Sequence, residues 1–215
     1  YAANERQYMT SLIIQSSKYS FYLLFLLSLP IILEVDQILK LWLKTVPDYA
    51  SIFTVLVLVV ILITSISGPL MMAVQATGKI AIYQAVIGTL LILNLPISYI
   101  FLKVGYPPEV TLYITICLEI LALIFRFFFL KRLIDFPVLL FIKEIIFRNI
   151  LVILLSVSIP LIVKTSLDAN IWRLLIVIFL TILWNSIVIY FVGLNKSERK
   201  LIQESLHKIL FRITR

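Results

Sequence analysis

The chain has 215 residues, of which 62% are hydrophobic and 14% are charged, and its formal net charge is +8. Its mean hydropathy of +1.10 excludes an ordinary soluble globular protein, which balances apolar and charged residues more evenly. The single cysteine, Cys117, excludes an internal disulfide and a cysteine-based zinc site, and we expect it to be a small packing residue. The composition therefore favours an integral membrane protein.

Six long apolar runs, separated by short polar segments, fill most of the sequence. Their approximate limits are Leu12–Leu33, Ile52–Ala76, Ile80–Leu102, Val110–Leu130, Ile145–Val163 and Trp172–Val192. Each is close to the length of about 20 helical residues that crosses a hydrocarbon core about 30 Å thick. Because lipid offers no partners to backbone N–H and C=O groups, such runs must be helices. The sequence predicts an all-α integral membrane protein, with six transmembrane helices in a bundle over residues 1–194 and an amphipathic cytoplasmic tail helix over residues 195–215.

The distribution of basic residues predicts the orientation of the chain. With a cytoplasmic N-terminus, 14 of the 19 Lys and Arg residues lie on the cytoplasmic side. The outer side then holds Lys40, Lys44, Lys103, Lys164 and Arg173. Cytoplasmic segments of membrane proteins carry such an excess of basic residues, so we expect both ends of the chain and the segment 131–148 to be cytoplasmic. This asymmetry accounts for the net positive charge without a nucleic-acid partner.

Three shorter features are predicted to lie at the membrane surface. Lys18 lies near the inner end of the first run, from where its ammonium group can reach the lipid headgroups. Residues 34–48 mix apolar side chains with Asp36 and lysines, and predict either a short interfacial helix or an ordinary amphipathic loop. Residues 131–148 mix Phe and Leu with basic residues, and we expect them to lie on the anionic inner leaflet.

Proline predicts bends in the second and third runs. Pro69 follows Gly68, has no N–H group, and its ring clashes with the carbonyl four residues earlier. Pro96, two residues after Asn94, has the same effect in the third run. Gly78 then ends the second helix, so the second and third helices form a hairpin. Gly68, Pro69 and Pro96 are therefore candidate hinge residues.

Glu119 and Arg126 are the charged residues within the fourth run. An unpaired charge there costs at least about 2.5–3.5 kcal/mol, so Glu119 should face protein or a water-filled cavity. It is either a carboxylate that couples transport to an ion or proton, or a structural acid hydrogen-bonded to another helix. Arg126 lies seven residues later on roughly the same face, about 10 Å along the axis, too far for a direct salt bridge without side-chain reach or water. It either lines the mouth of a cavity or extends to the headgroups.

Polar amides complete the set of candidate site residues. Gln75, Gln84, Asn94 and Asn185 are expected to be buried amides that link helices, and the first three also join Glu119 and Arg126 as a possible substrate or ion pathway. The sequence contains no nucleophile–base pair, Gly-rich phosphate loop or zinc-protease motif, and its one histidine, His207, has no metal-binding company. We therefore expect no catalytic residue, metal or cofactor, and no enzymatic activity.

Several local patterns resemble bacterial polysaccharide exporters, the O-antigen and capsule flippases of the multidrug/oligosaccharidyl-lipid/polysaccharide exporter superfamily. The matching segments are Leu27–Ile32 (LSLPII), Ile38–Pro47 (ILKLWLKTVP), Ser67–Lys79 (SGPLMMAVQATGK), Leu93–Tyr99 (LNLPISY) and the basic pair Lys131–Arg132. These motifs are hydropathic and loose, and the resemblance depends on their order and spacing. It covers essentially the whole chain.

The resemblance implies a function, a location and partners. It implies that the chain is the C-terminal half of a longer transporter, with the N-terminal half of the same chain as its missing partner. Such transporters flip undecaprenyl-linked polysaccharide repeat units across the bacterial inner membrane by alternating access between two lobes. The expected partners are thus the lipid bilayer and a lipid-linked oligosaccharide substrate.

Three other functions remain open from the sequence. The first alternative is a multidrug-type antiporter of the same superfamily, because the loose motifs do not distinguish such an antiporter from a flippase. A six-span permease subunit of an ATP-driven transporter is a second alternative, although the short Gly78–Lys79 turn argues against the long cytoplasmic extensions of such subunits. A membrane enzyme of polysaccharide assembly is the third, and would be expected to have a larger polar outer loop.

Overall fold

The computed structural model describes residues 2–78, 80–200 and 203–204, and of residues 2–5 it describes the backbone alone. These residues form helices and no strand. The helices are α1 (Ala2–Leu33), α2 (Val35–Trp42), α3 (Ala50–Ala76), α4 (Ala81–Ile92), α5 (Asn94–Val104), α6 (Val110–Ile134), α7 (Val138–Phe141), the π-helix η1 (Ile142–Phe147), α8 (Arg148–Ser166), α9 (Ile171–Val188) and the π-helix η2 (Ile189–Gly193).

Six helical stretches are long and apolar enough to cross a membrane. They are Arg6–Leu33, Ala50–Ala76, Ala81–Val104, Val110–Ile134, Val138–Ser166 and Ile171–Gly193. The predicted all-helical class and the six candidate spans are thereby confirmed. The largest differences from the predicted limits are the earlier starts of the first and fifth stretches. Helix extends back into polar residues before the first run, and into the apolar residues from Val138 before the fifth.

The chain divides into two compact units, residues 1–145 and residues 146–215, which are described separately below. The predicted tail helix over residues 195–215 lies largely outside the described residues. Within it, residues 196–200 are helical. The predicted boundary at residue 195 therefore stays a prediction.

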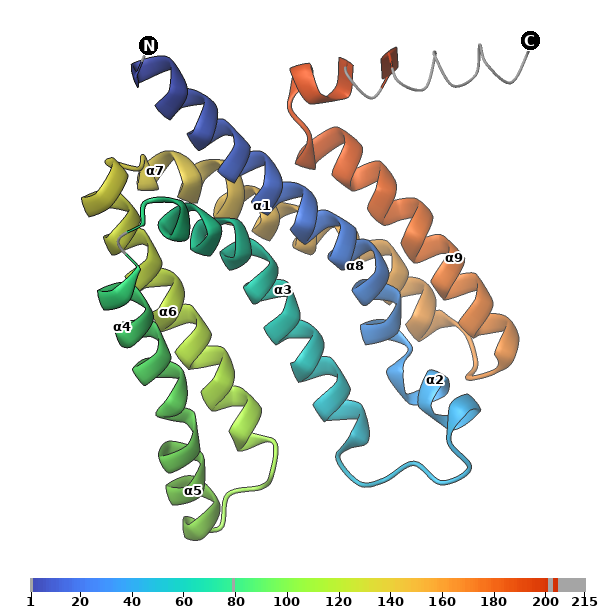
Figure 1. The fold of residues 1–215 in the computed structure, drawn as a ribbon. Helices are drawn as coiled ribbons and strands as arrows, with labels where there is room; N and C mark the ends of the chain where they lie inside the picture. The colour runs from blue at the N-terminus through green and yellow to red at the C-terminus, as the bar shows by residue number, and fades with distance from the viewer. Residues whose placement is uncertain (1, 79, 201–202, 205–215) are drawn as a thin grey trace. The chain divides into compact units, whose positions relative to one another are not determined.

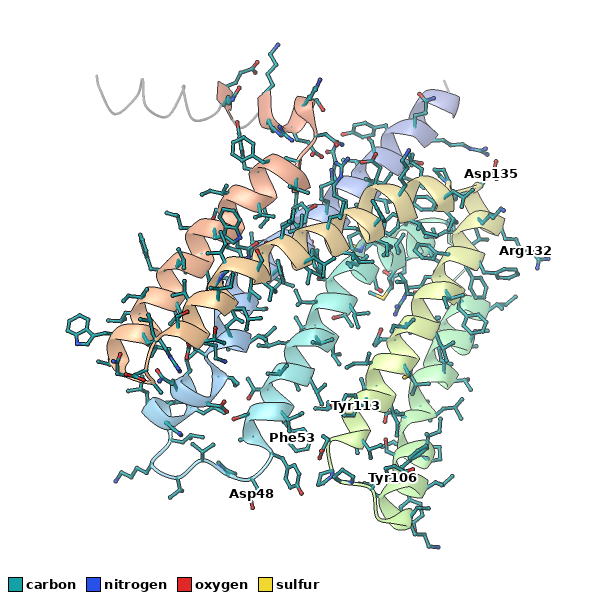
Figure 2. All side chains as sticks on the ribbon, turned by 180° about the vertical axis from the view of Figure 1, so that it is seen from behind. Asp48, Phe53, Tyr106, Tyr113, Arg132 and Asp135 are labelled. Carbon is teal, nitrogen blue, oxygen red and sulfur yellow. The ribbon has the colours of Figure 1, made fainter. Side chains whose placement is uncertain are left out.

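In the first unit, α3 packs against both α1 and α6, and α4 and α5 pack against α6 (Figure 1). Side chains that are fully buried in this unit include Leu70, Val74, Tyr83, Ala122, Leu130 and Phe141. Figure 2 shows Asp48 and Tyr106 at one end of this unit and Arg132 and Asp135 at the opposite end. The segments that connect α2 to α3 and α5 to α6 thus share one end, as the predicted antiparallel arrangement requires.

The third candidate span is interrupted where proline was predicted to bend it. α4 ends at Ile92 and α5 begins at Asn94, with Leu93 forming a turn between them. Pro96 has no N–H group to donate to the carbonyl of Ile92, which removes one hydrogen bond from this turn. In contrast, α3 continues as helix through Pro69, and Figure 1 shows its last turns leaving the direction of the first part.

The connecting segments are more helical than predicted. Of the two alternatives for residues 34–48, the structure has a short helix, α2, which buries Val35 and Leu39 and leaves Trp42 81% exposed. The segment 131–148 was predicted to lie on the membrane surface, but helix resumes at Val138 and the segment is partly buried. Phe136 and Phe141 are buried, with ring centroids 5.9 Å apart, because they pack in an aromatic cluster with Phe127 of α6.

The second unit is a hairpin of α8 and α9. The helices bury side chains at spacings of three and four residues, which places these on one face of each helix. The buried residues are Asn149, Val152, Ser156 and Pro160 in α8, and Leu174, Val177, Thr181, Asn185 and Val188 in α9. The Ser156 hydroxyl donates to Asn185 Oδ1 at 3.0 Å, so Asn185 links two helices as predicted.

Two single-residue predictions were wrong. Lys18 does not extend to a surface, since its side chain is 1% exposed and packed within the protein. Cys117 is exposed on α6 and is therefore not a packing residue. The hydropathy of neither helix indicates which of its sides is buried.

Candidate functional site: a buried ion pair

The two charged residues in the apolar part of the fourth candidate span, before its basic end at Lys131 and Arg132, lie on the buried face of α6. Glu119 and Arg126 are 9% and 5% exposed, and the adjacent Leu118 and Ala122 are also buried. The opposite face of the same helix, including Ile120, is exposed. Because α6 packs against both α3 and α4, Glu119 faces the protein interior, as predicted from the cost of leaving a carboxylate in hydrocarbon.

Glu119 and Arg126 form an ion pair. The distance from Arg126 Nη1 to Glu119 Oε2 is 3.5 Å. Arg126 Nε also donates a hydrogen bond of 3.3 Å to the Tyr83 hydroxyl of α4. The guanidinium group therefore bridges the two helical turns that separate Glu119 from Arg126. Its bond to Tyr83 also links α6 to α4.

The direct contact differs from the sequence expectation for a reason in helix geometry. Side chains of an α-helix lean toward its N-terminus, so the long arginine side chain extends back along α6 toward Glu119. This reach covers the axial gap of about 10 Å between residues seven apart. The same direction takes the Arg126 guanidinium into the protein, so the predicted alternative of extension to the headgroups is wrong.

Tyr83 is a member of the site that sequence reasoning did not identify. It lies 43 residues before Arg126 and is 1% exposed. Its ring packs edge-on against Phe129, with the ring centroids 5.6 Å apart, which holds the hydroxyl beside the guanidinium. The only signal in the sequence was a tyrosine in an apolar run, and no local spacing connects it to α6.

Asn94 belongs to a second polar cluster, between α5 and α6. Its Nδ2 donates to the Thr115 hydroxyl at 2.7 Å, and its Oδ1 accepts from the Ser98 hydroxyl at 2.7 Å. The Thr115 hydroxyl in turn donates to the Thr111 carbonyl at 2.8 Å. This chain of bonds links the helices beside the interruption at Leu93, which is the packing role predicted for a buried amide, although Asn94 is half-buried.

The other candidate pathway residues are not brought to the ion pair. Gln75 and Gln84 are exposed, so their prediction as buried amides was wrong. An amide in an apolar run can lie on any face, and here both lie on the outer faces of their helices. The candidate hinge residues Gly68 and Pro69 are half-buried within α3, and Pro96 is exposed in α5. Their role as hinges stays a prediction.

The site places two opposite charges together within an apolar interior. A carboxylate and a guanidinium at 3.5 Å attract each other more strongly there than in water, because the effective dielectric constant is lower. The pair as a whole is neutral, because the two opposite charges balance.

Comparison with known proteins identifies no relative of this chain. No protein-family model matches the chain, and no curated protein or solved structure matches it either. The resemblance to polysaccharide exporters accordingly rests on the sequence segments given above, and the roles of Glu119, Arg126 and Tyr83 rest on their geometry.

Proposed function

We propose that the chain is the C-terminal part of a multi-pass transporter of the bacterial inner membrane that exports lipid-linked polysaccharide repeat units. The observation that carries the transport assignment is the Glu119–Arg126 ion pair, buried inside a helix long and apolar enough to span a membrane. Charged residues are costly at that depth and are concentrated on substrate and ion pathways in membrane proteins. The order of the exporter-like segments supports the choice of cargo.

Aromatic residues at one end of the first unit support the proposed insertion. Tyr49, Tyr106 and Tyr113 are each about half exposed, and Trp42 is more exposed. Figure 2 shows Tyr106 and Tyr113 at the same end of the unit as Asp48. Tyr and Trp are enriched where a membrane protein crosses from hydrocarbon to headgroups. We therefore propose that this end lies at the periplasmic surface of the membrane, and that the basic end with Arg132 lies at the cytoplasmic surface.

In the proposed cycle, Glu119 and Arg126 alternate between pairing with each other and binding other groups. A proton that reaches Glu119 Oε2 neutralises the carboxylate, and Arg126 then contacts the phosphate oxygens of the anionic lipid-linked substrate. Loss of that proton restores the carboxylate, which competes with the substrate for Arg126 and favours release. Tyr83 keeps the guanidinium beside α4 in both states through its hydrogen bond to Nε.

The test is the substitution Glu119→Gln in the transporter as it occurs in the cell. The amide keeps the shape and hydrogen-bonding capacity of the side chain but cannot gain or lose the proton. We expect export of the polysaccharide to fall at least about tenfold while the amount of protein in the membrane stays nearly unchanged, corresponding to about 1.4 kcal/mol in the transport barrier. Appearance of the polymer at the cell surface measures export.

A matched control is Asp168→Asn, which makes the same chemical change at an exposed turn between α8 and α9. This variant should export normally. Full export by Glu119→Gln would reject the coupling role and leave Glu119 as a structural residue. Loss of the Glu119→Gln protein from the membrane would also favour the structural role.

A further inference from the structure

A cavity of about 400 Å³ lies at the basic end of the first unit, away from the ion pair. Its walls are the first turns of α1 and the turn that joins α6 to α7. The polar side of the lining includes Arg6, Thr10 and Asp135, and the apolar side includes Ile14, Ile134 and Leu140. The volume is within the range of about 300–1,000 Å³ that is typical of pockets for small ligands.

The cavity contains two opposite charges that do not pair with each other. Arg6 and Asp135 both line it, and within the part of the chain that the structure describes neither takes part in an ion pair. Asp135 is held in position by the end of α6, where its backbone is left-handed (φ 53°) and its N–H donates to the Lys131 carbonyl at 3.1 Å. A ligand that carries both a positive and a negative group would satisfy both residues.

The position of the cavity indicates that this ligand also has an apolar part. α6 ends at Ile134, and the polar residues Arg6, Gln7, Thr10 and Ser11 precede the apolar part of α1, so the cavity lies where apolar helix gives way to polar residues. Figure 2 shows Asp135 at this end of the unit, beyond the long apolar stretch of α6. In a membrane, this level is that of the lipid headgroups, and Ile14 and Leu140 would face the acyl chains.

We infer that the cavity binds the headgroup of a zwitterionic aminophospholipid, with its phosphate on Arg6 and its primary ammonium on Asp135. An anionic headgroup without an amine would meet repulsion from the Asp135 carboxylate. A quaternary ammonium has no N–H to donate, whereas a primary ammonium has three, and charge-assisted hydrogen bonds are the stronger ones. The inference rests on the membrane insertion proposed above but is independent of export.

The test compares lipids bound to the purified chain by native mass spectrometry. Phosphatidylethanolamine, phosphatidylcholine and phosphatidylglycerol with the same acyl chains are offered in equal amounts. We expect retention of phosphatidylethanolamine over each of the others by about tenfold, which corresponds to one charge-assisted hydrogen bond of about 1.4 kcal/mol. Soluble glycerophosphoethanolamine should fail to displace phosphatidylethanolamine at equal concentration, since the soluble compound lacks acyl chains. Displacement would show that the site binds a free headgroup and would overturn the lipid assignment.

Two variants and one control assign the preference to the cavity. Asp135→Asn should abolish the preference for phosphatidylethanolamine over phosphatidylglycerol without disturbing the turn, because asparagine also adopts the left-handed conformation readily. Arg6→Gln should weaken the retention of all three lipids. Arg132→Gln is the control, since Arg132 is exposed, does not line the cavity and points outward in Figure 2.

The possible failures separate this inference from the proposed insertion. Equal retention of the three lipids by the unaltered chain would overturn the headgroup assignment, as would a preference that survives Asp135→Asn. A chain that does not enter bilayers at all would instead overturn the insertion on which the inference rests. Loss of export activity in Glu119→Gln leaves the lipid preference unchanged, because Glu119 does not line the cavity.

Discussion

At the scale of single residues, the main feature is the mutual dependence of Glu119 and Arg126. Both are buried, and each is the other's ionic partner at 3.5 Å. Burial removes water from both charges, so the Glu119 carboxylate depends on the guanidinium for stabilisation, whereas an amide in its place can still accept a hydrogen bond from Arg126. The cost of removing the guanidinium alone should therefore exceed the cost of removing both charges together.

Arg126→Met tests this dependence. The substitution keeps an unbranched side chain but leaves the Glu119 carboxylate without its ionic partner, and loss of one partner of a buried pair costs about 3–5 kcal/mol in soluble proteins. We expect the free energy of unfolding in mixed micelles to fall by an amount in this range. Adding Glu119→Gln to the same chain should recover part of the loss, because the unpaired charge is then absent.

Two control variants test whether the effect of Arg126→Met is specific to the ion pair. Tyr83→Phe removes only the hydroxyl that accepts from Arg126 Nε, so its cost should be near the average of about 0.6 kcal/mol for a hydrogen bond in a membrane protein. Arg132→Met, at an exposed position, should have a smaller effect than Arg126→Met. If the effects of Arg126→Met and Glu119→Gln simply add, the two residues are not coupled and the ion pair does not form in solution.

The residue scale also shows what hydropathy can and cannot predict. A carboxylate in an apolar run must face protein, and Glu119 does. Gln75 and Gln84 carry no charge, so an outward position costs little enough that the sequence could not determine their face. The pairing of Glu119 with Arg126 depends on the conformation of a long side chain, and its tie to Tyr83 depends on which helices pack together.

At the scale of helices, the interruption of the third candidate span has an identifiable local cause. Pro96 removes one backbone hydrogen bond from the turn at Leu93. Immediately beside it, Asn94 bonds to Thr115 of α6 and to Ser98 of α5. The proline therefore weakens the helix where a side-chain network holds its second half, α5, against α6. Such a position can bend without losing the contact between α5 and α6.

Pro96→Ala should reduce the bend between α4 and α5. Alanine restores the N–H that can donate to the Ile92 carbonyl, and proline kinks usually exceed about 20°. Residual dipolar couplings of the backbone amides measure the directions of the two helices. We expect them to differ by more than about 20° in the unaltered chain and by less in the variant.

The control for this prediction is Pro160→Ala in α8, which should leave the directions of α4 and α5 unchanged. An unaltered chain in which α4 and α5 are collinear within about 10° would contradict the predicted bend. A bend that persists in Pro96→Ala would assign its cause to the packing of Asn94 and Leu93 instead of to the proline.

The positions of the long helices were predictable because the length of an apolar run is enough to identify a candidate span. The structure of the connecting segments was less predictable. At the early start of the fifth stretch, which begins at Val138, Phe141 packs against both Phe127 and Phe136. That contact joins two helices and leaves no periodic signal in either sequence. The short helix α2 was one of two alternatives, and burial of Val35 and Leu39 favours it.

At the scale of the whole molecule, the proposed orientation connects the charge distribution with the ends of the first unit. Asp48 and Tyr106 lie at one end of this unit, and Arg132 and Asp135 lie at the other (Figure 2). The structure thus agrees with the sequence on which segments of this unit share an end, and the excess of basic residues predicts which end is cytoplasmic. The lipid site inferred above would then face the cytoplasmic leaflet.

Reporter fusions test this orientation directly. Fusions after Asp48, Pro107 and Asp168 should be active in the periplasm, because each of these positions precedes a helix that re-enters the membrane from the outer side. A fusion after Arg215 should be active in the cytoplasm, since six spans would return the chain to the side on which it began, and the proposed orientation places 14 of its 19 basic residues on that side. At every position, one reporter that is active in the periplasm and one that is active in the cytoplasm provide the internal control. A periplasmic C-terminus would invert the orientation, place Arg6 and Asp135 in the outer leaflet, and require the aromatic end of the first unit to face the cytoplasm.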